Sequence, residues 1–178
     1  MRSRISGLPR FIVTPTTAKH RIFAWAPAGS LPSIAVVAIA SAEDWVFGVL
    51  QSSAHRIWSR AVSTQLREAA SASRYLPQTS FETFPFPRPT DEQREAIAAA
   101  ARELVRLRGG WLNPPGLDPD ELSKRTLTNL YNARPTWLQH AHAALDTAVL
   151  AAYGWPPDLA GEPLLAALLA LNLERDPA

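Results

Sequence analysis

The chain has 178 residues, of which 47% are hydrophobic and 19% are charged, a composition typical of a folded domain and unlike that of a disordered tail. No apolar run approaches the roughly 20 residues that a membrane-spanning helix needs, and the first residues lack the apolar middle of a signal peptide. The sequence contains no Cys, which excludes disulfides and thiolate metal sites. We therefore expect a cytoplasmic protein without membrane contact.

The net charge is only +2, but the charges are unevenly distributed. Residues 1–75 carry nine basic and three acidic side chains, a balance of +6, whereas residues 76–178 carry nine bases and thirteen acids, a balance of −4. Sixteen of the eighteen basic residues are Arg, which makes bidentate contacts to phosphate or guanine that Lys cannot make. Such a basic half is typical of a nucleic-acid-binding surface, although a solvated basic face explains the charge alone equally well.

Short strands are predicted first along the chain. The β-branched and aromatic runs at residues 10–15 and 20–27 both end at Pro, as strands often do. The continuous apolar run at residues 33–41 predicts a central, buried strand.

Two helices are expected to follow these strands. Ser41 is placed to cap the first, with Asp44 three residues on, and the second is expected to begin at Ser52 or Ser53. Six aromatic residues of the N-terminal half are interpreted as core and not as stacking platforms, because several of them fall on the apolar faces of predicted elements. These residues are Trp25, Trp45, Trp58, Phe81, Phe84 and Phe86.

Only helices are predicted after the Pro-rich segment that ends near residue 90. Thr90 is expected to cap a helix over residues 91–108, whose acidic first turn and basic last turn both suit the helix dipole. Gly109 and Gly110 are expected to end it. Further helices are predicted over residues 119–133, 135–154 and 161–175.

These elements predict an α+β fold with a small mixed sheet and helices in the N-terminal half and an all-helical C-terminal region. The change in character near residue 87 predicts two domains, residues 1–87 and residues 88–178.

One short motif invites a catalytic interpretation. Asn113-Pro114-Pro115 matches the start of the Asn-Pro-Pro-aromatic motif with which amino-group DNA methyltransferases hold a flipped base. The fourth residue is Gly116, which cannot stack on a base, and no Gly-x-Gly cofactor loop occurs in the sequence. We therefore interpret residues 113–116 as a connector between helices, and we expect no catalytic or cofactor-binding residue.

The histidines indicate no metal site, because none of the four has the spacing of a ligand pair. His142 and Asp146 are four residues apart on a predicted helix, so they could pair on its surface. No metal site and no covalent nucleophile is expected.

Several long stretches together resemble the C-terminal part of the MmeI-like DNA methyltransferases of bacterial restriction–modification systems. They occur in the family's order at residues 19–25, 47–58, 73–87, 127–156 and 168–175. In that family a catalytic domain with the cofactor loop comes first, followed by a target recognition domain and a helical C-terminal region. The resemblance covers nearly the whole chain and implies the end of a recognition domain plus that helical region, without the catalytic domain.

The resemblance implies a sequence-recognition module for a DNA adenine-N6 methyltransferase, with double-stranded DNA and a methyltransferase catalytic domain or subunit as partners. No catalysis is expected from this chain alone, because S-adenosylmethionine belongs to the missing catalytic domain. Two alternatives are a protein-interaction module that docks a separate methyltransferase subunit, and a gene remnant without function.

The resemblance also indicates DNA-contacting residues, because residues 64–75 lie in the segment that reads bases in family members. Arg67 and Arg74 are chemically suited to guanine, and Glu68 to a cytosine amino group. Arg74 has an alternative role, in which it opens a strand and pairs with a carboxylate. The phosphate-contact candidates are Lys19, His20, Arg21, Arg56 and Arg60.

Overall fold

The structure is a computed structural model that describes residue 5 and residues 7–63 and 72–175. Its strands are β1 (Arg10–Pro15), β2 (Thr17–Ala18), β3 (Ala24–Pro27), β4 (Val36–Ile39) and β5 (Ser73–Arg74). Its helices are α2 (Asp44–Gln51), α3 (Ser53–Ala61), the π-helical turn η1 (Pro77–Phe81), α4 (Asp91–Leu112), α5 (Pro119–Ser123), α6 (Leu127–Ala133), α7 (Thr136–Tyr153) and α8 (Gly161–Arg175). The predicted α+β fold with a helical C-terminal region is confirmed.

Strand β1 is the centre of an antiparallel sheet with the order β3-β1-β4. Ile12 of β1 lies opposite Trp25 on one side and Ile39 on the other. The apolar run 33–41, which predicts a central strand, instead forms the edge strand Val36–Ile39, so this prediction is wrong. Its residues alternate between half-buried and buried positions, as expected where helices cover only one face of an antiparallel sheet.

A second, two-stranded ladder joins β2 to β5, with Thr17 opposite Arg74. The predicted strand over residues 20–27 forms only from Ala24 onward. The residues before it turn toward the interior, where the Phe23 backbone N–H donates to Gln51 Oε1 at 2.8 Å. This contact ties the start of β3 to the end of α2.

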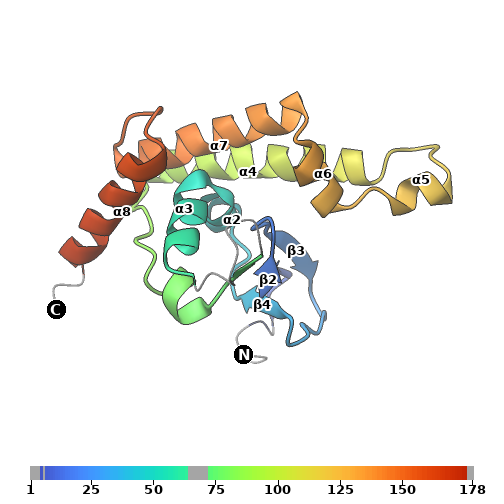
Figure 1. The fold of residues 1–178 in the computed structure, drawn as a ribbon, viewed down its shortest axis with the longest axis horizontal. Coiled ribbons are helices and arrows are strands. Elements are labelled where there is room, and N and C mark those ends of the chain that lie inside the picture. Colours follow the sequence, from blue (N-terminus) through green and yellow to red (C-terminus); the bar gives the residue numbers. More distant parts are fainter. Residues whose placement is uncertain (1–4, 6, 64–71, 176–178) are drawn as a thin grey trace.

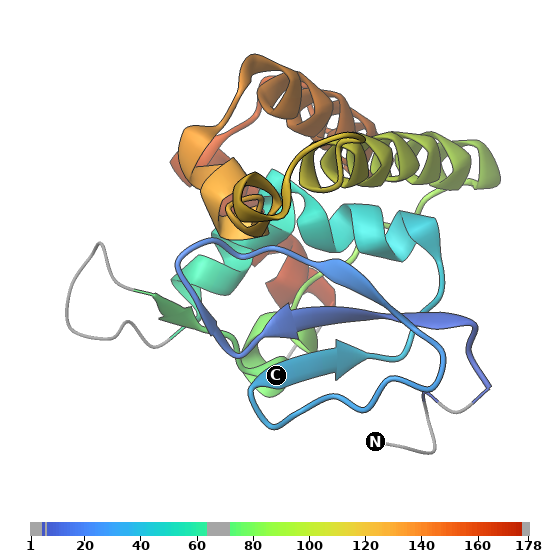
Figure 2. The ribbon, with the colours of Figure 1, turned by 90° about the vertical axis from the view of Figure 1, so that its right-hand side faces the viewer.

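The elements stack in layers, with the sheet at one side, α2 and α3 in the middle, and the pair α4 and α7 on the other side (Figure 1). Figure 2, turned by 90°, shows the same order, with the sheet beneath the helices. Helix α2 packs on α4 and α7, and α8 packs on α3. None of the helices in the described part combines the length and apolar character that a membrane crossing demands.

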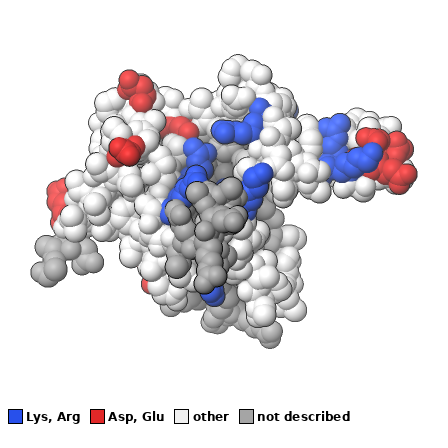
Figure 3. All heavy atoms as spheres, in the orientation of Figure 1, with Lys and Arg blue, Asp and Glu red and all other residues white. Residues whose placement is uncertain are grey.

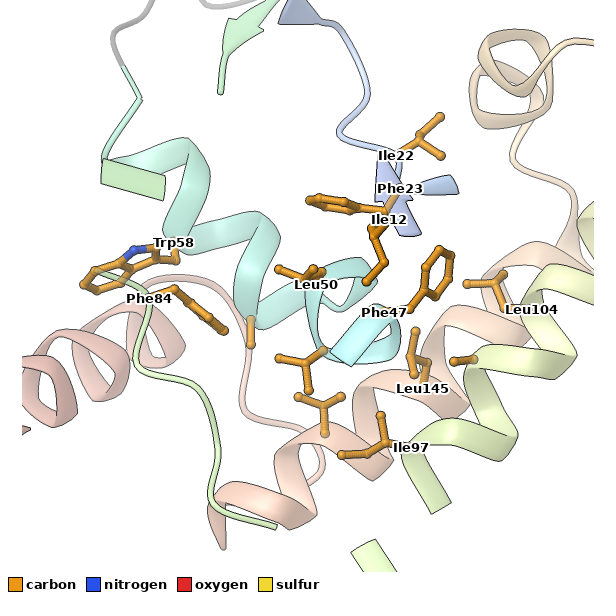
Figure 4. Packing of buried hydrophobic residues seen from close by; sticks show 14 of the residues in the cluster. Ile12, Ile22, Phe23, Phe47, Leu50, Trp58, Phe84, Ile97, Leu104 and Leu145 are labelled. Atoms are coloured by element: carbon orange, nitrogen blue, oxygen red, sulfur yellow. The ribbon is translucent and has the colours of Figure 1, made fainter. Parts of the chain in front are cut away.

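One hydrophobic cluster connects these layers. The ring of Phe47 on α2 stacks on Trp25 of the sheet at 4.9 Å between ring centroids. Side chains of α2, α4 and α7, among them Phe47, Leu104 and Leu145, meet in the same cluster (Figure 4). The cluster crosses residue 88, so both predicted domains contribute to a shared core, and the division at that residue stays a prediction.

The six aromatic side chains interpreted as core residues do belong to this cluster. Trp58 and Phe84 are buried within it, with their rings in edge contact. The remaining four pack against it as half-buried side chains: Trp25, Trp45, Phe81 and Phe86. This interpretation is confirmed.

The start of α2 differs from the prediction. Glu43, not Ser41, is the residue that precedes the helix, and neither caps it with a side-chain hydrogen bond to the first turn. Asp44 accepts instead from Arg10 of β1 at 2.8 Å and lies 3.4 Å from Arg102 of α4. The acidic first turn therefore ties α2 to its neighbours.

Helix α4 begins as predicted and ends later. Thr90 forms a complete capping box with Gln93, but the helix runs through Gly109 and Gly110 to Leu112. Trp111 packs against the core, and this tertiary contact outweighs the roughly 1 kcal/mol that each helical Gly costs. The helix ends just before the Pro pair that follows Asn113, because a Pro restricts the residue before it to extended backbone geometry.

Residues 113–116 connect α4 to α5, as predicted. The single helix predicted over residues 119–133 is wrong, because it is divided into α5 and α6. Thr126 ends the connection between them, since its hydroxyl accepts from the Asn129 N–H and caps α6. Helix α7 ends at Gly154 in the left-handed conformation, as its sequence predicts.

Candidate nucleic-acid interface

A cleft of about 630 Å³ lies between α3, the turn that joins β2 to β3, and the corner between α6 and α7. We call it the basic cleft, because five cationic side chains line it against one carboxylate. The cations are Lys19, Arg21, Arg56, Arg60 and Arg134, and the carboxylate is Asp146. Figure 3 shows one group of Lys and Arg side chains near the centre of the view and a second at its right-hand end, where it lies beside Asp and Glu side chains.

All five phosphate candidates line this one cleft. The sequence places them in two segments more than thirty residues apart, and the fold brings the segments together. They do not have equivalent environments, however, and the structure divides them into exposed and buried groups.

Helix α3 presents Arg56 and Arg60 to solvent. They are four residues apart and therefore lie on one face of the helix, while Ala54 and Trp58 point into the core. Both guanidinium groups therefore have access to a ligand in the cleft.

The β2–β3 turn provides the facing wall. Lys19 Nζ donates to Asn132 Oδ1 at 2.9 Å, and His20 Nε2 lies 2.9 Å from the same oxygen. Asn132 belongs to α6, so the C-terminal half holds these two residues in place. Lys19 uses one of its three donors in this bond and keeps the others for a ligand.

Arg21 is mostly buried and hydrogen-bonded within the fold. It is only 9% exposed, and its guanidinium donates to Thr14 Oγ1, to the Pro15 carbonyl and to the Ser73 carbonyl, the last at 2.8 Å. The same group lies over the Tyr75 ring, and burial lowers the pKa of Arg21 to about 10. Arg21 therefore joins β1 to β5, and its predicted phosphate contact stays a prediction.

The base-reading candidates lie next to the cleft or outside the described residues. Arg74 is exposed on β5, one residue from Ser73, which lines the cleft. Its place in β5 agrees with the strand part of the alternative role, while no carboxylate of the described residues forms an ion pair with it. Arg67 and Glu68 lie outside the described residues, so their assignment stays a prediction.

The C-terminal half contributes lining residues that the sequence interpretation missed. Arg134 is exposed at the corner between α6 and α7, and Tyr131, Gln139 and His142 lie beside it. The acidic balance of residues 76–178 concealed this contribution, because net charge along a segment carries no information on which side chains share a face. The left-handed backbone of Arg134 cannot be recognised from the sequence either.

Two of the lining side chains, Tyr131 and His142, are connected to the buried Arg108. Arg108 donates to the Phe23 carbonyl at 3.1 Å and to the Tyr131 hydroxyl, and that hydroxyl lies 2.8 Å from His142 Nε2. Burial, followed by the charges of Arg108, Arg56 and Arg134, lowers the pKa of His142 to about 3. His142 is therefore neutral at physiological pH, and the charge of the cleft comes from its arginines and Lys19.

Asp146 does not pair with His142, contrary to the possibility raised by their spacing. Its Oδ1 accepts from the backbone N–H of Ser53, the first residue of α3, at 2.7 Å. The Ser52 hydroxyl, a predicted cap, instead donates backward to the Val49 carbonyl. Burial raises the pKa of Asp146, while the Ser53 N–H and Arg56 lower it. The one carboxylate of the cleft therefore caps α3 from a distant helix.

A metal-based site has no support within the described part of the chain, where no cluster of His, Asp and Glu could hold an ion. The site is thus a cationic surface whose chemistry is suited to binding phosphate groups.

Comparison with known proteins agrees with this fold. Residues 9–88 match the family described as "MmeI, target recognition domain". DNA methyltransferase A of Bacillus subtilis (strain 168) is 30% identical over 169 residues, which are 92% of this chain and 18% of that protein. The Type IIL restriction-modification enzyme MmeI, solved in complex with DNA, matches 93% of this chain and 21% of its own with 27% identity and a TM-score of 0.78.

These matches show a likeness to a target recognition domain of restriction–modification enzymes, followed by a helical segment. More specifically, residues 9–88 are similar to the target recognition domain of MmeI. The chain spans about a fifth of the length of both relatives.

Proposed function

We propose that this chain recognises double-stranded DNA for a site-specific adenine-N6 methyltransferase of a restriction–modification system. The observation that carries the proposal is the basic cleft, in which Arg56, Arg60 and Lys19 face a common space. The match to a target recognition domain supports it, as does the likeness to an enzyme solved in complex with DNA. A cytoplasmic location and a methyltransferase partner belong to the same proposal.

The catalytic step is assigned to another part of such an enzyme. The sequence has no Gly-x-Gly turn, and the described sheets are antiparallel, so these residues do not fit the usual S-adenosylmethionine site at the end of a parallel strand. We propose that a catalytic domain or subunit holds the cofactor. Arg74, Arg67 and Glu68 remain our candidates for reading bases.

Salt-dependent DNA binding tests the proposal. A fluorescent duplex should bind with an affinity that falls by about 0.9 log unit per log unit of salt for each phosphate contacted. Arg56→Ala or Arg60→Ala should weaken binding to every duplex alike and flatten this slope by about one unit. Fluorescence anisotropy at several salt concentrations measures both quantities.

Arg106→Ala is the matched control, because Arg106 is exposed on α4, pairs with Glu103 and does not line the cleft. This variant should leave affinity and slope unchanged. An absence of salt-dependent binding, with or without a catalytic partner, would refute DNA recognition and favour the protein-interaction module.

A further inference from the structure

The corner between α6 and α7 is a rigid part of the basic cleft. The Arg134 backbone N–H donates to the Leu130 carbonyl at 2.9 Å and closes α6. Its carbonyl accepts from Gln139 Nε2 at 2.9 Å, which fastens the corner to α7. The backbone that carries the Arg134 side chain is therefore fixed from both sides.

Arg134 holds an unusual backbone conformation. Among the described residues, it is the one non-glycine residue with a positive φ, at 45° with a ψ of 58°. Glycine is the common residue at such helix ends, because a Cβ atom is unfavourable there. A strained Arg at a glycine position suggests that its side chain has a use beyond the fold.

The Arg134 side chain is available for a ligand. It is exposed, and no described carboxylate forms an ion pair with it. It lines the same space as Arg56 of α3. The charges of both residues lower the pKa of His142, which lines the same cleft, and the one carboxylate there, Asp146, accepts a hydrogen bond from the Ser53 N–H and forms no ion pair with Arg134.

We infer that Arg134 is a phosphate-binding residue and that the DNA interface extends beyond the recognition-domain match into the helical C-terminal region. In this arrangement Arg134 and α3 lie on two sides of the cleft, and the phosphate backbone of one DNA strand binds between them. Asn132 supports the same arrangement as a positioning residue, because it holds Lys19 and His20 at the rim. The inference rests on the proposed function and names a further residue of that site.

The substitution Arg134→Gly separates binding from folding. It removes the cation and also relieves the backbone, so the midpoint of thermal unfolding should stay the same or rise by up to about 3 °C. Affinity for any duplex should nevertheless fall by about eightfold at 0.1 M salt, the loss expected for one phosphate contact. The salt slope should flatten by about one unit, as measured by fluorescence anisotropy.

Two further variants complete the test. Arg134→Lys keeps the charge and should keep the wild-type salt slope, and Arg106→Ala on α4 should leave binding unchanged. The inference is overturned if Arg134→Gly binds DNA as tightly as the wild type does. It is also overturned if Arg134→Gly lowers both the DNA affinity and the midpoint of thermal unfolding, and Arg134→Lys does not keep the wild-type salt slope. If the wild type binds DNA and Arg56→Ala weakens that binding, an unchanged affinity of Arg134→Gly contradicts only the role of Arg134. If the wild type does not bind DNA at all, the proposed function itself is refuted.

Discussion

At the residue scale, His55 shows how the core fixes a protonation state. It is fully buried, with Nδ1 3.1 Å from the Leu50 carbonyl and Nε2 3.1 Å from the Tyr75 hydroxyl. The rings of Phe23 and Phe84 pack edge-on against it. Burial lowers its pKa to about 4, backbone hydrogen bonds partly oppose this, and Arg21 lowers it further. The buried ring is therefore neutral.

This depressed pKa predicts a loss of stability in acid. The unfolded chain binds a proton at His55 below about pH 6.5, whereas the folded chain does not until about pH 4, so the free energy of unfolding is highest above pH 6.5 and falls as the pH drops toward 4. His55 alone should remove about 2 kcal/mol between pH 7 and pH 5. The lowered pKa of His142 also reduces stability as the pH falls, whereas the raised pKa of Asp146 has the opposite effect on stability.

Urea unfolding at pH 7 and pH 5 measures this loss, and His55→Gln, which cannot titrate, should show a smaller difference between the two values. NMR of the His55 ring supplies an independent reading. Titration of that ring near pH 6.5 would contradict the prediction.

At the element scale, Gly48 sets how closely the helices approach. A Cβ atom at this position of α2 would lie 2.6 Å from Ile97 Cγ2 and 3.2 Å from Ala101 Cβ, both on α4, and 3.2 Å from Leu145 Cδ1 on α7. A glycine inside a helix costs about 1 kcal/mol relative to alanine. The close packing of three helices accounts for it here.

We therefore expect Gly48→Ala to destabilise the fold by about 1–3 kcal/mol, because α2 must move away from α4. Gly109→Ala is the matched control, since Gly109 is also helical but a Cβ atom added there would meet no other atom within 4 Å. The control should stabilise the protein by about 0.5–1 kcal/mol. Equal changes in the free energy of unfolding for the two substitutions, measured with urea, would show that helix propensity and not packing determines the effect of an alanine at Gly48.

At the scale of the whole molecule, local signals were predictable and relations between distant segments were not. The capping box at Thr90 and the left-handed Gly154 depend on neighbouring residues, and their sequence patterns indicated them. The helix end expected at Gly109 was wrong, because the packing of Trp111 on the core is a tertiary contact. The edge position of β4 likewise depends on its partners and not on its own apolar run.

The candidate site shows the same difference between local sequence signals and contacts of distant segments. Composition and resemblance named Arg56 and Arg60, and the structure shows them exposed in the basic cleft, where their phosphate role stays a prediction. They could not distinguish Arg21, whose burial results from contacts to Thr14 and Ser73. Nor could they place Arg134, because it lies in the acidic half of the sequence and reaches the cleft only through the packing of α6 and α7.

The continuous core leads to a prediction about the recognition-domain match in isolation. Truncation after Thr90 removes α4 and α7, which cover the buried face of α2. Phe47, Val49 and Leu50 are at most 1% exposed in the full chain, and without these helices much of that apolar surface would face water. Burying a side chain of this size contributes about 1.5–3 kcal/mol, a large part of the 5–15 kcal/mol that typically separates folded from unfolded domains.

Residues 1–90 alone should therefore aggregate or unfold without a cooperative transition, and co-expression with residues 91–178 should restore a soluble complex. Circular dichroism during heating and size-exclusion chromatography check both outcomes. A soluble 1–90 fragment with a cooperative thermal transition would show that the two segments are independent domains. In that case the docking of α2 on α4 and α7 would be an interface between domains, and the helical region could be exchanged without loss of the recognition fold.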